Sequence, residues 1–253
     1  MLYVIVIILI ILFGFACKRL REPFKTVPYT TVMQTVSNTQ YVPPKVSKNW
    51  TKYAPEVNRV LMNDTACVKF LKEHFGATYV AKFNSFEHGA HKADLFRYAW
   101  LYVKGGVYMD IKTELIKPFK ELFPNPSICY LIVTDRSYAP NERIYNGIIA
   151  TPPRNPLMYS LLQGTMQMTN EHEYIHNCEE GFSIASSFCT SGLKQYGLNE
   201  TLPQIPNLYV YKEAPTTIDH CDYQTDRYDM CMFIEDRGEK IIKVRYSDYP
   251  WEW

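Results

Sequence analysis

The sequence predicts an α/β fold in which a mixed sheet is flanked by helices. Short apolar runs rich in β-branched residues alternate along the chain with amphipathic segments. One stretch, from His91 to Glu114, places a helical pattern, a glycine break, a short apolar run and an acid in succession. At 253 residues the chain suits one domain with a sizeable core. Since open α/β sheets bind ligands at the carboxyl ends of their strands, this stretch predicts a site as well as a fold.

The helix within that stretch is predicted over 91–104. Its apolar residues recur at spacings of three and four and form one face: Ala93, Leu95, Tyr98, Ala99, Leu101 and Tyr102. Gly105 and Gly106 then end the helix, because glycine adopts a left-handed conformation without a Cβ clash. The run 107–110 is predicted to be a buried strand that delivers the carboxylate of Asp110 at its end.

Three charged residues lie close together on the other side of this helix: Lys92, Asp94 and Arg97. Asp94 and Arg97 are three residues apart and are therefore neighbours in space. Spacing alone allows two interpretations. The pair is either a surface ion pair contributing about 0.3–0.5 kcal/mol or part of a binding site.

The remaining elements follow from the same patterns. Strands are predicted at 31–36, 57–62, 127–134, 144–150, 208–211, 231–235 and 241–246, and helices at 46–53, 65–75 and 156–168. Asn63 or Asp64 is expected to cap the helix that follows, and Gly76 to end it. Residues 77–89 are predicted to be a connector.

Composition narrows the class of function. Hydrophobic residues make up 47% and charged residues 21% of the chain, as in an ordinary globular protein. The net charge is +1, so no polyanionic partner is implied and binding to nucleic acid is not expected. The 20 tyrosines suit either a core or a surface that stacks against carbohydrate, and composition does not separate the two.

The N-terminal segment 1–17 differs from the rest, because it is apolar and has no charged side chain. Its length is at the short end of what spans a bilayer. It lacks the basic start and small-residue cleavage site of a signal peptide, so a transmembrane signal anchor is the better prediction. Residues 18–30 would then form a juxtamembrane stem, and residues 31–253 the folded domain.

The side of the membrane is contested within the sequence. Basic residues follow the apolar run and none precedes it, which favours a cytosolic domain. Three glycosylation triplets, at Asn49, Asn63 and Asn199, favour the lumen instead. Six cysteines outside the apolar run permit disulfides without requiring them, and the absence of a CxxC pair makes a zinc site improbable.

The stretch KADLFRYAWLYVKGGVYMDI resembles the core signature of glycosyltransferases with a DXD sugar-binding region. That group, family 32, includes the yeast-type initiating α-1,6-mannosyltransferases, and capsular polysaccharide synthesis proteins and the large clostridial glucosylating toxins have a similar core. Ten positions match the family's pattern at fixed spacing: Lys92, Ala93, Asp94, Arg97, Leu101, Gly105, Gly106, Val107, Tyr108 and Asp110. The chain departs from the pattern at Lys112, where the family has its second Asp.

The resemblance implies a nucleotide-diphospho-sugar transferase of the GT-A-like fold, with residues 31–253 as its catalytic domain. The implied reaction moves a hexose from a UDP- or GDP-sugar to a glycan or other acceptor, with retention of configuration. It also implies a membrane enzyme of the secretory pathway (Golgi or ER) whose domain faces the lumen. The alternative is a catalytically degenerate protein that binds a nucleotide sugar or carbohydrate without turnover.

The resemblance assigns roles to named residues. It implies catalytic roles for Asp94, Arg97 and Asp110, and substrate binding by Lys92, Gly106, Tyr108, Lys112 and Asn146. Asp110 would hold a divalent cation, Mn²⁺ or Mg²⁺, against the donor's diphosphate. Arg97 offers a fork that matches phosphate geometry.

Lys112 leaves the metal open, because a protonated amine is not a ligand. Either Lys112 itself counters the diphosphate charge, or another acid supplies the second ligand. Glu114 is the nearest candidate, because alternate residues of a strand share one face and 110, 112 and 114 would then reach the same site.

Weaker matches lie elsewhere in the chain. The segment NGIIATPPRNPLMYSLL resembles a family segment that begins with Asn, which places Asn146 within an apolar strand. Its amide needs partners there, either a neighbouring backbone group or the sugar. Gln34 is a weak candidate for the nucleotide side of the site, and the favoured alternative is a plain strand residue. Residues 181–196 correspond to a helix and turn in the family. Trp251 and Trp253 would either close over the nucleotide as a lid, as a C-terminal Trp loop does in the related toxins, or dock in a hydrophobic groove.

Overall fold

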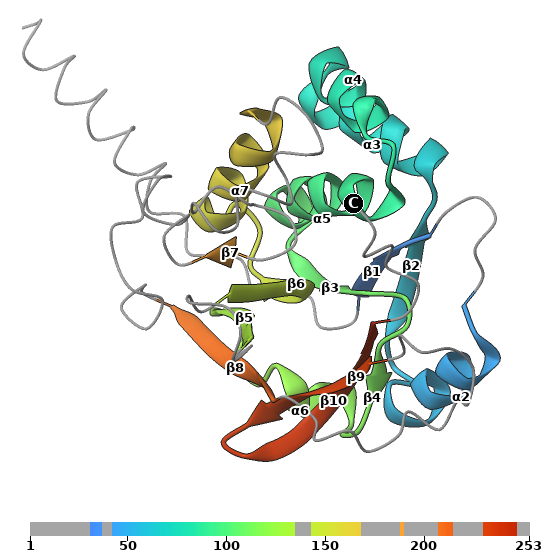
Figure 1. Cartoon of the computed structure of the whole chain (residues 1–253), viewed down its shortest axis with the longest axis vertical. Helices are drawn as coiled ribbons and strands as arrows, with labels where there is room; N and C mark the ends of the chain where they lie inside the picture. Colours follow the sequence, from blue (N-terminus) through green and yellow to red (C-terminus); the bar gives the residue numbers. More distant parts are fainter. Residues whose placement is uncertain are drawn as a thin grey trace, which may run out of the picture.

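The computed structural model describes residues 31–36, 42–134, 143–167, 188–189, 207–214 and 230–246. Figure 1 shows a mixed sheet with helices on both faces, as the sequence predicts. The strand order is β2-β1-β3-β6-β5-β8-β9-β10-β4, with β7 paired to β6. β1 lies parallel to both β2 and β3, and β5 is parallel to β8. The pairs β3–β6 and β5–β6 are antiparallel, so β6 joins two parallel sets.

The sheet consists of short strands in the described part of the chain. They are β1 (Thr31–Thr35), β2 (Asn58–Met62), β3 (Gly106–Met109), β4 (Glu114–Leu115), β5 (Cys129–Thr134), β6 (Arg143–Thr151), β7 (Phe188–Cys189), β8 (Leu208–Ala214), β9 (Met230–Asp236) and β10 (Glu239–Tyr246). The helices are α2 (Pro44–Tyr53), α3 (Asp64–Phe75), α4 (Ala77–Ser85), α5 (Gly89–Lys104), α6 (Phe119–Leu122) and α7 (Pro156–Gln167).

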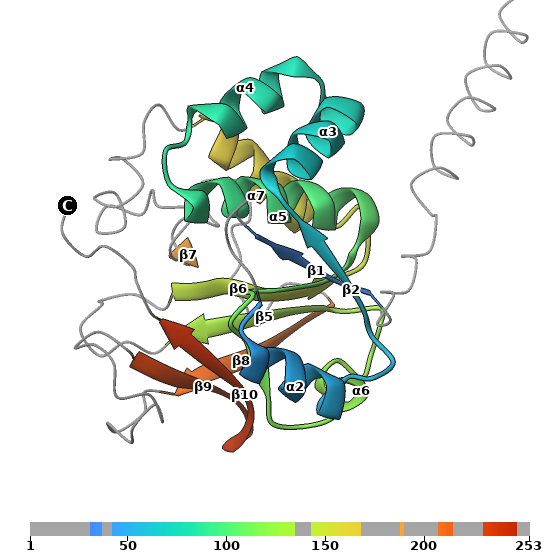
Figure 2. The same ribbon diagram turned by 90° about the vertical axis from the view of Figure 1, so that its right-hand side faces the viewer.

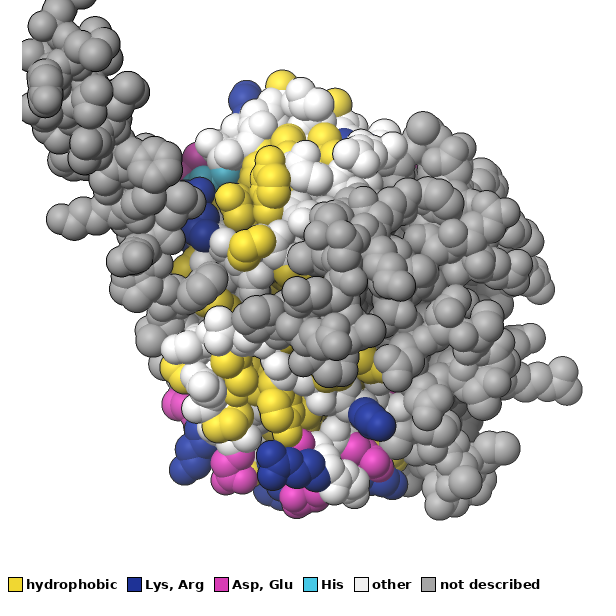
Figure 3. Space-filling view, turned by 90° about the vertical axis from the view of Figure 1, so that its left-hand side faces the viewer, with side chains coloured by type: hydrophobic (Ala, Val, Ile, Leu, Met, Phe, Trp, Pro, Cys, Tyr) yellow, Lys and Arg dark blue, Asp and Glu magenta, His cyan; other side chains and the backbone are white. Residues whose placement is uncertain are grey.

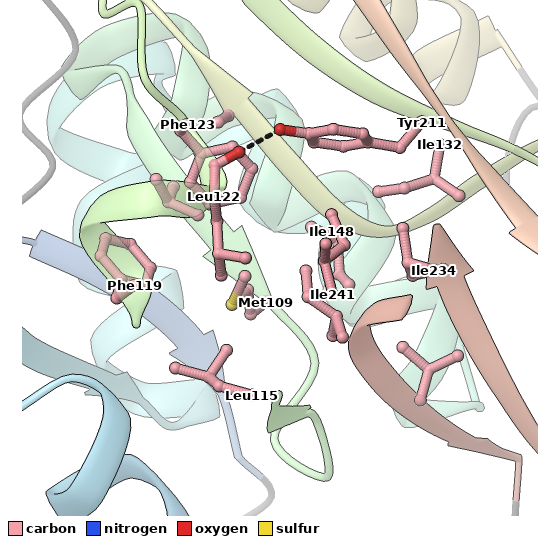
Figure 4. Close-up of a cluster of buried hydrophobic side chains, with 14 of the residues drawn as sticks. Met109, Leu115, Phe119, Leu122, Phe123, Ile132, Ile148, Tyr211, Ile234 and Ile241 are labelled. Atoms are coloured by element: carbon pink, nitrogen blue, oxygen red, sulfur yellow. Dashed lines mark hydrogen bonds between the residues drawn. The ribbon is translucent and has the colours of Figure 1, made fainter. Parts of the chain in front are cut away.

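The helices form two layers on opposite faces of the sheet. α3, α4, α5 and α7 cover one face, and α2 and α6 cover the other (Figure 2). Each strand alternates between the two layers, as the period of two requires. Met33 and Tyr108 belong to the core beneath α5, whereas Val32 and Val107 belong to the core on the opposite face. Figure 4 shows this second core, where Met109 and Ile148 of the sheet meet Phe119 and Leu122 of α6.

Most elements predicted from the sequence are confirmed, with bounds that differ by a few residues. Asn63 is the N-cap of α3, and its Oδ1 accepts a hydrogen bond from Ala66 N at 2.9 Å. Gly76 ends that helix with a φ of 87°. The predicted connector 77–89 was wrong, because residues 77–85 form α4. The side chain of Phe83 on α4 is 1% exposed, so burial of an apolar face stabilises this short helix.

Several predictions lie outside the described residues: the anchor 1–17, the stem 18–30, Asn199, Trp251 and Trp253. Within the described part of the chain, none of the helices combines the length and apolarity needed to cross a membrane. The helix expected in 181–196 disagrees with β7, which occupies two residues of that segment. Cys67 and Cys129 are free buried thiols, so neither forms a disulfide.

Charge is mixed in sign on one described face of the molecule. On the face in Figure 3, Lys and Arg side chains lie among Asp and Glu side chains at the lower end, with hydrophobic side chains above them. This distribution agrees with a net charge of +1 over the whole chain.

Candidate active site

Asp110 follows the last residue of β3, at the carboxyl end of the parallel strands β1, β2 and β3. Its Oδ1 accepts a hydrogen bond from the Tyr108 hydroxyl at 2.8 Å, and its Oδ2 accepts one from the Tyr145 hydroxyl at 3.1 Å. Its backbone N–H donates to the carbonyl of Gly147 at 2.8 Å. The carboxylate is therefore oriented on both oxygens and is placed where an α/β sheet binds its ligand.

Arg97 connects Asp110 to helix α5. Its Nη2 lies 2.9 Å from Asp94 Oδ1 and 3.6 Å from Asp110 Oδ1. Its guanidinium stands 4.2 Å from the centre of the Tyr108 ring, a cation–π contact. Because the side chains of Asp94 and Arg97 are only 6% and 5% exposed, the surface-ion-pair interpretation was wrong.

Asn146 joins the same network from β6. Its Nδ2 donates to Asp94 Oδ1 at 3.0 Å and to the Tyr98 hydroxyl at 3.1 Å, and its backbone carbonyl accepts from Arg97 Nη1 at 2.5 Å. The amide predicted to need partners within an apolar strand therefore finds them in side chains of α5. Asp94 receives both Arg97 and Asn146, so it holds these two groups in place.

Burial decreases from Asp94 towards Asp110. The Asp110 side chain is 40% exposed, against 5% for Arg97. Asp110 is thus the charged group of this cluster that is open to a ligand, with Arg97 and Tyr108 directly behind it. A donor sugar or phosphate would contact Asp110 first. Arg97 would attract its negative charge strongly, because few waters lie between buried groups.

The network also fixes protonation states. Burial lowers the pKa of Arg97, but electrostatic interactions with Tyr108, Asp94 and Asp110 raise that pKa well above its ordinary value. Burial raises the pKa of the Tyr108 hydroxyl, Arg97 lowers it and Asp110 raises it, with a net increase. Arg97 is therefore a permanent cation and Tyr108 a neutral donor to Asp110.

The prediction that residues 110–114 continue as one strand was wrong. Ile111 and Lys112 form a turn, closed by a hydrogen bond from Thr113 N to the Asp110 carbonyl at 3.0 Å. Beyond the turn, Glu114 pairs with β10, and its carboxylate lies 3.9 Å from Lys45 Nζ. Glu114 therefore does not share a strand face with Asp110, and the argument for it as a second metal ligand no longer holds. Lys112 is half-buried in the turn next to Asp110.

Two other predicted substrate-binding residues lie apart from this cluster. Gly106 pairs with Thr151 at the opposite end of β3 from Asp110, and its φ of 96° accounts for glycine there. Lys92 points to Asp64, with 3.4 Å between Nζ and Oδ2. Asp64 begins α3 just beyond the carboxyl end of β2, so this ion pair stands on the site side of the sheet.

Sequence reasoning missed Tyr145, Gly147 and the polar role of Tyr98. Gly147 is required by space, because a Cβ there would overlap Asp110 Oδ2 and the Tyr145 hydroxyl. The available signal was the triplet Tyr145-Asn146-Gly147, a polar and glycine interruption within an apolar strand. The sequence pattern places Tyr98 on the apolar face of the helix, and only the folded chain brings Asn146 to its hydroxyl.

The donor set suits one kind of divalent cation. Among the residues that the structure describes, no group of three His, Cys, Asp or Glu side chains is placed to hold a metal ion. Mg²⁺ and similar cations often keep several waters and use one or two carboxylates together with substrate phosphates. Asp110 meets this requirement, so the residues fit a cation shared with a diphosphate better than a cation held by protein alone.

Part of the chain matches a known protein family. Residues 44–145 match the family model described as "Glycosyltransferase sugar-binding region containing DXD motif". The match includes β2, α5, β3 and the Asp110 turn, and it confirms the family that the sequence pattern predicted. This segment is therefore similar to the sugar-binding region of glycosyltransferases.

Individual relatives are distant. An uncharacterized glycosyltransferase of Acanthamoeba polyphaga mimivirus is 22% identical over 162 residues, which are 60% of this chain and 61% of that protein. The initiation-specific alpha-1,6-mannosyltransferase of Saccharomyces cerevisiae is 31% identical over 74 residues, 28% of this chain and 15% of the yeast protein. The chain thus spans less than two thirds of either relative. The solved structure of PaToxG glycosyltransferase aligns with a TM-score of 0.48 and 17% identity, over 69% of this chain and 71% of that one.

Proposed function

We propose that this protein is a membrane-anchored glycosyltransferase of the GT-A-like type. It transfers a hexose from a nucleotide-diphosphate sugar to a glycan or other acceptor with retention of configuration. The observation that carries the proposal is the cluster of Asp94, Arg97, Tyr108 and Asp110, which lies within the matched segment and at the ligand-binding end of the sheet. The yeast relative is named a mannosyltransferase, which makes mannose from a GDP donor one candidate.

The proposed reaction breaks one bond, forms one bond and gives Asp110 and Arg97 different roles. The bond from the anomeric carbon to the phosphate oxygen breaks, and the acceptor hydroxyl bonds to the same face of that carbon. The acceptor's proton passes to the leaving phosphate. Asp110 orients the donor, and the permanent charge of Arg97 stabilises the negative charge that develops on the diphosphate. A divalent cation bound through Asp110 would supply further neutralisation of that charge.

The proposal is tested with the full-length chain in detergent. UDP, GDP and their hexose conjugates are screened by thermal shift with and without Mn²⁺, and donors that bind are assayed for hydrolysis and transfer. The variant Asp110→Asn should lose on the order of 100-fold in turnover, because it removes one preorganised charge from the site.

A matched control is Asp236→Asn. Asp236 also accepts a tyrosine hydroxyl, that of Tyr209 at 2.7 Å, but Tyr209 lies near the amino end of β8, away from the site. This control should keep wild-type turnover. Equal turnover in Asp110→Asn and wild type would refute the assignment of the site.

Lys112 favours one alternative, a nucleotide-sugar-binding protein without turnover, because it replaces a metal-binding acid by a cation. That alternative predicts a thermal shift with UDP or GDP and no hydrolysis of any donor. In an active enzyme, EDTA distinguishes the two accounts of Lys112. Partial loss of activity indicates that its ammonium counters the diphosphate, whereas complete loss restored by Mn²⁺ indicates that Asp110 holds an essential cation.

A further inference from the structure

The turn that carries Asp110 and Lys112 is held at both ends by buried side chains. Gln34, on β1 and 0% exposed, donates from Nε2 to the carbonyls of Met109 at 3.2 Å and Asp110 at 3.3 Å. Trp50, on α2 and 2% exposed, donates from Nε1 to the carbonyl of Thr113 at 2.9 Å. The two side chains come from different elements and fix the start and the end of the same turn.

Arg59 joins these two side chains. From β2, its Nε and Nη2 donate to Gln34 Oε1 at 2.9 and 2.6 Å. Its guanidinium also lies 4.7 Å from the centre of the Trp50 ring. Because β2 is separated from β3 by β1, Arg59 acts on the turn across the width of two strands. None of its contacts is with Asp110 itself, so its influence on the site is indirect.

The direction of the Gln34 amide depends on Arg59. Two charge-assisted bonds hold Oε1 towards Arg59, which leaves Nε2 to face the two carbonyls of the turn. They also polarise the amide, so Nε2 becomes a stronger donor. Without the guanidinium, Oε1 of a fully buried side chain would lose its charged donors. The two carbonyls of the turn would then orient the amide alone, and the bonds from Nε2 to them would be weaker.

We propose that Arg59 is a positioning residue for the glycosyl-transfer site. Through Gln34 and Trp50 it fixes the turn that presents Asp110 and Lys112 to the diphosphate of the donor. This inference rests on the proposed function for its catalytic consequence, while the clamp itself is a property of the unliganded protein. Displacement of a reacting group by about 1 Å typically costs about 100-fold in rate, so a loosened turn should be visible in turnover.

The test compares Arg59→Met and Arg59→Lys with a matched control, Arg154→Met. Arg154 also lies over a tyrosine ring, that of Tyr102 at 5.5 Å, and it stands at the other end of the sheet, beside the amino end of β3. Two readouts are taken on the full-length chain: hydrogen exchange of the peptide covering 107–116, and kcat, KM and Mn²⁺ requirement for donor hydrolysis.

We expect exchange of the turn amides to rise about tenfold in Arg59→Met, with a smaller rise in Arg59→Lys, which keeps the charge but not the fork. kcat should fall at least about tenfold in Arg59→Met, and the Mn²⁺ concentration for half activation should rise. Arg154→Met should change neither readout.

Either of two results would overturn the proposal. One is unchanged exchange at 107–116 in both Arg59 variants. The other is faster exchange with wild-type kcat and Mn²⁺ requirement, which would make Arg59 purely structural. A wild-type chain that hydrolyses no donor would instead refute the proposed function, and the exchange experiment would still decide whether Arg59 holds the turn.

Discussion

At the scale of single residues, Arg97 is the group on which the site is built. It is a buried cation that contacts Asp94 and Asp110, the carbonyl of Asn146 and the ring of Tyr108. A buried charge is costly unless it is paired and hydrogen-bonded, and breaking such a pair leaves the partner uncompensated. The energetic demand of Arg97 therefore explains why an Asp and an Asn occur inside an otherwise apolar core.

Replacing Arg97 by Gln should lower the free energy of unfolding by about 3–5 kcal/mol, because Asp94 would remain buried without its cation. Urea unfolding followed by tryptophan fluorescence measures this change. Lys104→Gln, at the exposed end of the same helix, should alter stability by no more than about 0.5 kcal/mol. If the free energy of unfolding falls by the same small amount in both variants, the Asp94–Arg97 pair is a solvated surface pair.

Gly147 offers a way to disturb Asp110 without changing any charge. A Cβ in the variant Gly147→Ala would overlap the Asp110 carboxylate and the Tyr145 hydroxyl, which lie at the far ends of their side chains. We expect these groups to shift, so donor hydrolysis should fall about 10- to 100-fold while the melting temperature changes by only a few degrees. Gly89→Ala, where a Cβ meets open space, serves as the control and should keep full activity. Wild-type hydrolysis in Gly147→Ala would mean that the orientation of Asp110 is not critical.

At the scale of elements, the unit that places the site is α5, the Gly105 break and β3. Gly105 has φ 65° and ψ −160°, a region that is essentially restricted to glycine. A Cβ there would also stand 2.5 Å from Pro153 N and 2.6 Å from Pro153 Cδ. The break thus lets the chain reverse against the segment that follows β6, and this close approach sets the distance between α5 and the sheet.

The variant Gly105→Ala should therefore cost more stability than backbone strain alone, which is about 1–3 kcal/mol. Gly238→Ala is the matched comparison, because Gly238 has a φ of 86° but nothing within 4 Å of its added Cβ. The difference in unfolding free energy between the two variants measures the contact with Pro153. Equal losses would show that the backbone around Pro153 yields to the extra methyl group.

The local sequence predicted most helices and strands correctly. It failed where contacts with distant elements determine the conformation of the backbone. The segment DIKTEL alternates like a strand, and Ile111, Thr113 and Leu115 are indeed buried. It turns nevertheless, because Gln34 and Trp50 bind its carbonyls and Asn49 bonds to both backbone groups of Leu115. None of these donors lies within the local sequence. The same holds for Tyr145, whose role depends on β6 lying beside β3.

At the scale of the whole molecule, the sheet separates two ends of the domain. Val32 pairs with Val107, so Thr31 stands beside the amino end of β3, and Asp110 stands at the opposite end. The chain that precedes Thr31 therefore joins the domain away from the site. We propose that residues 1–17 anchor the protein in a membrane and that the site faces acceptors in the lumen.

The glycosylation triplets give a test of that lumenal orientation. Asn63 is exposed after the carboxyl end of β2 and uses its Oδ1 as the cap of α3, whereas the Asn49 amide donates to Leu115 O at 2.9 Å and accepts from Leu115 N at 2.7 Å. In a eukaryotic secretory pathway, we therefore expect a glycan at Asn63 and none at Asn49.

Two variants test this expectation. Thr65→Ala removes the Asn63 triplet and keeps the cap, so it should abolish one endoglycosidase-sensitive mass shift. Thr51→Ala should change nothing. Loss of the shift in Thr51→Ala would contradict the packing of Asn49, and a wild-type chain insensitive to endoglycosidase would place the domain on the cytosolic side.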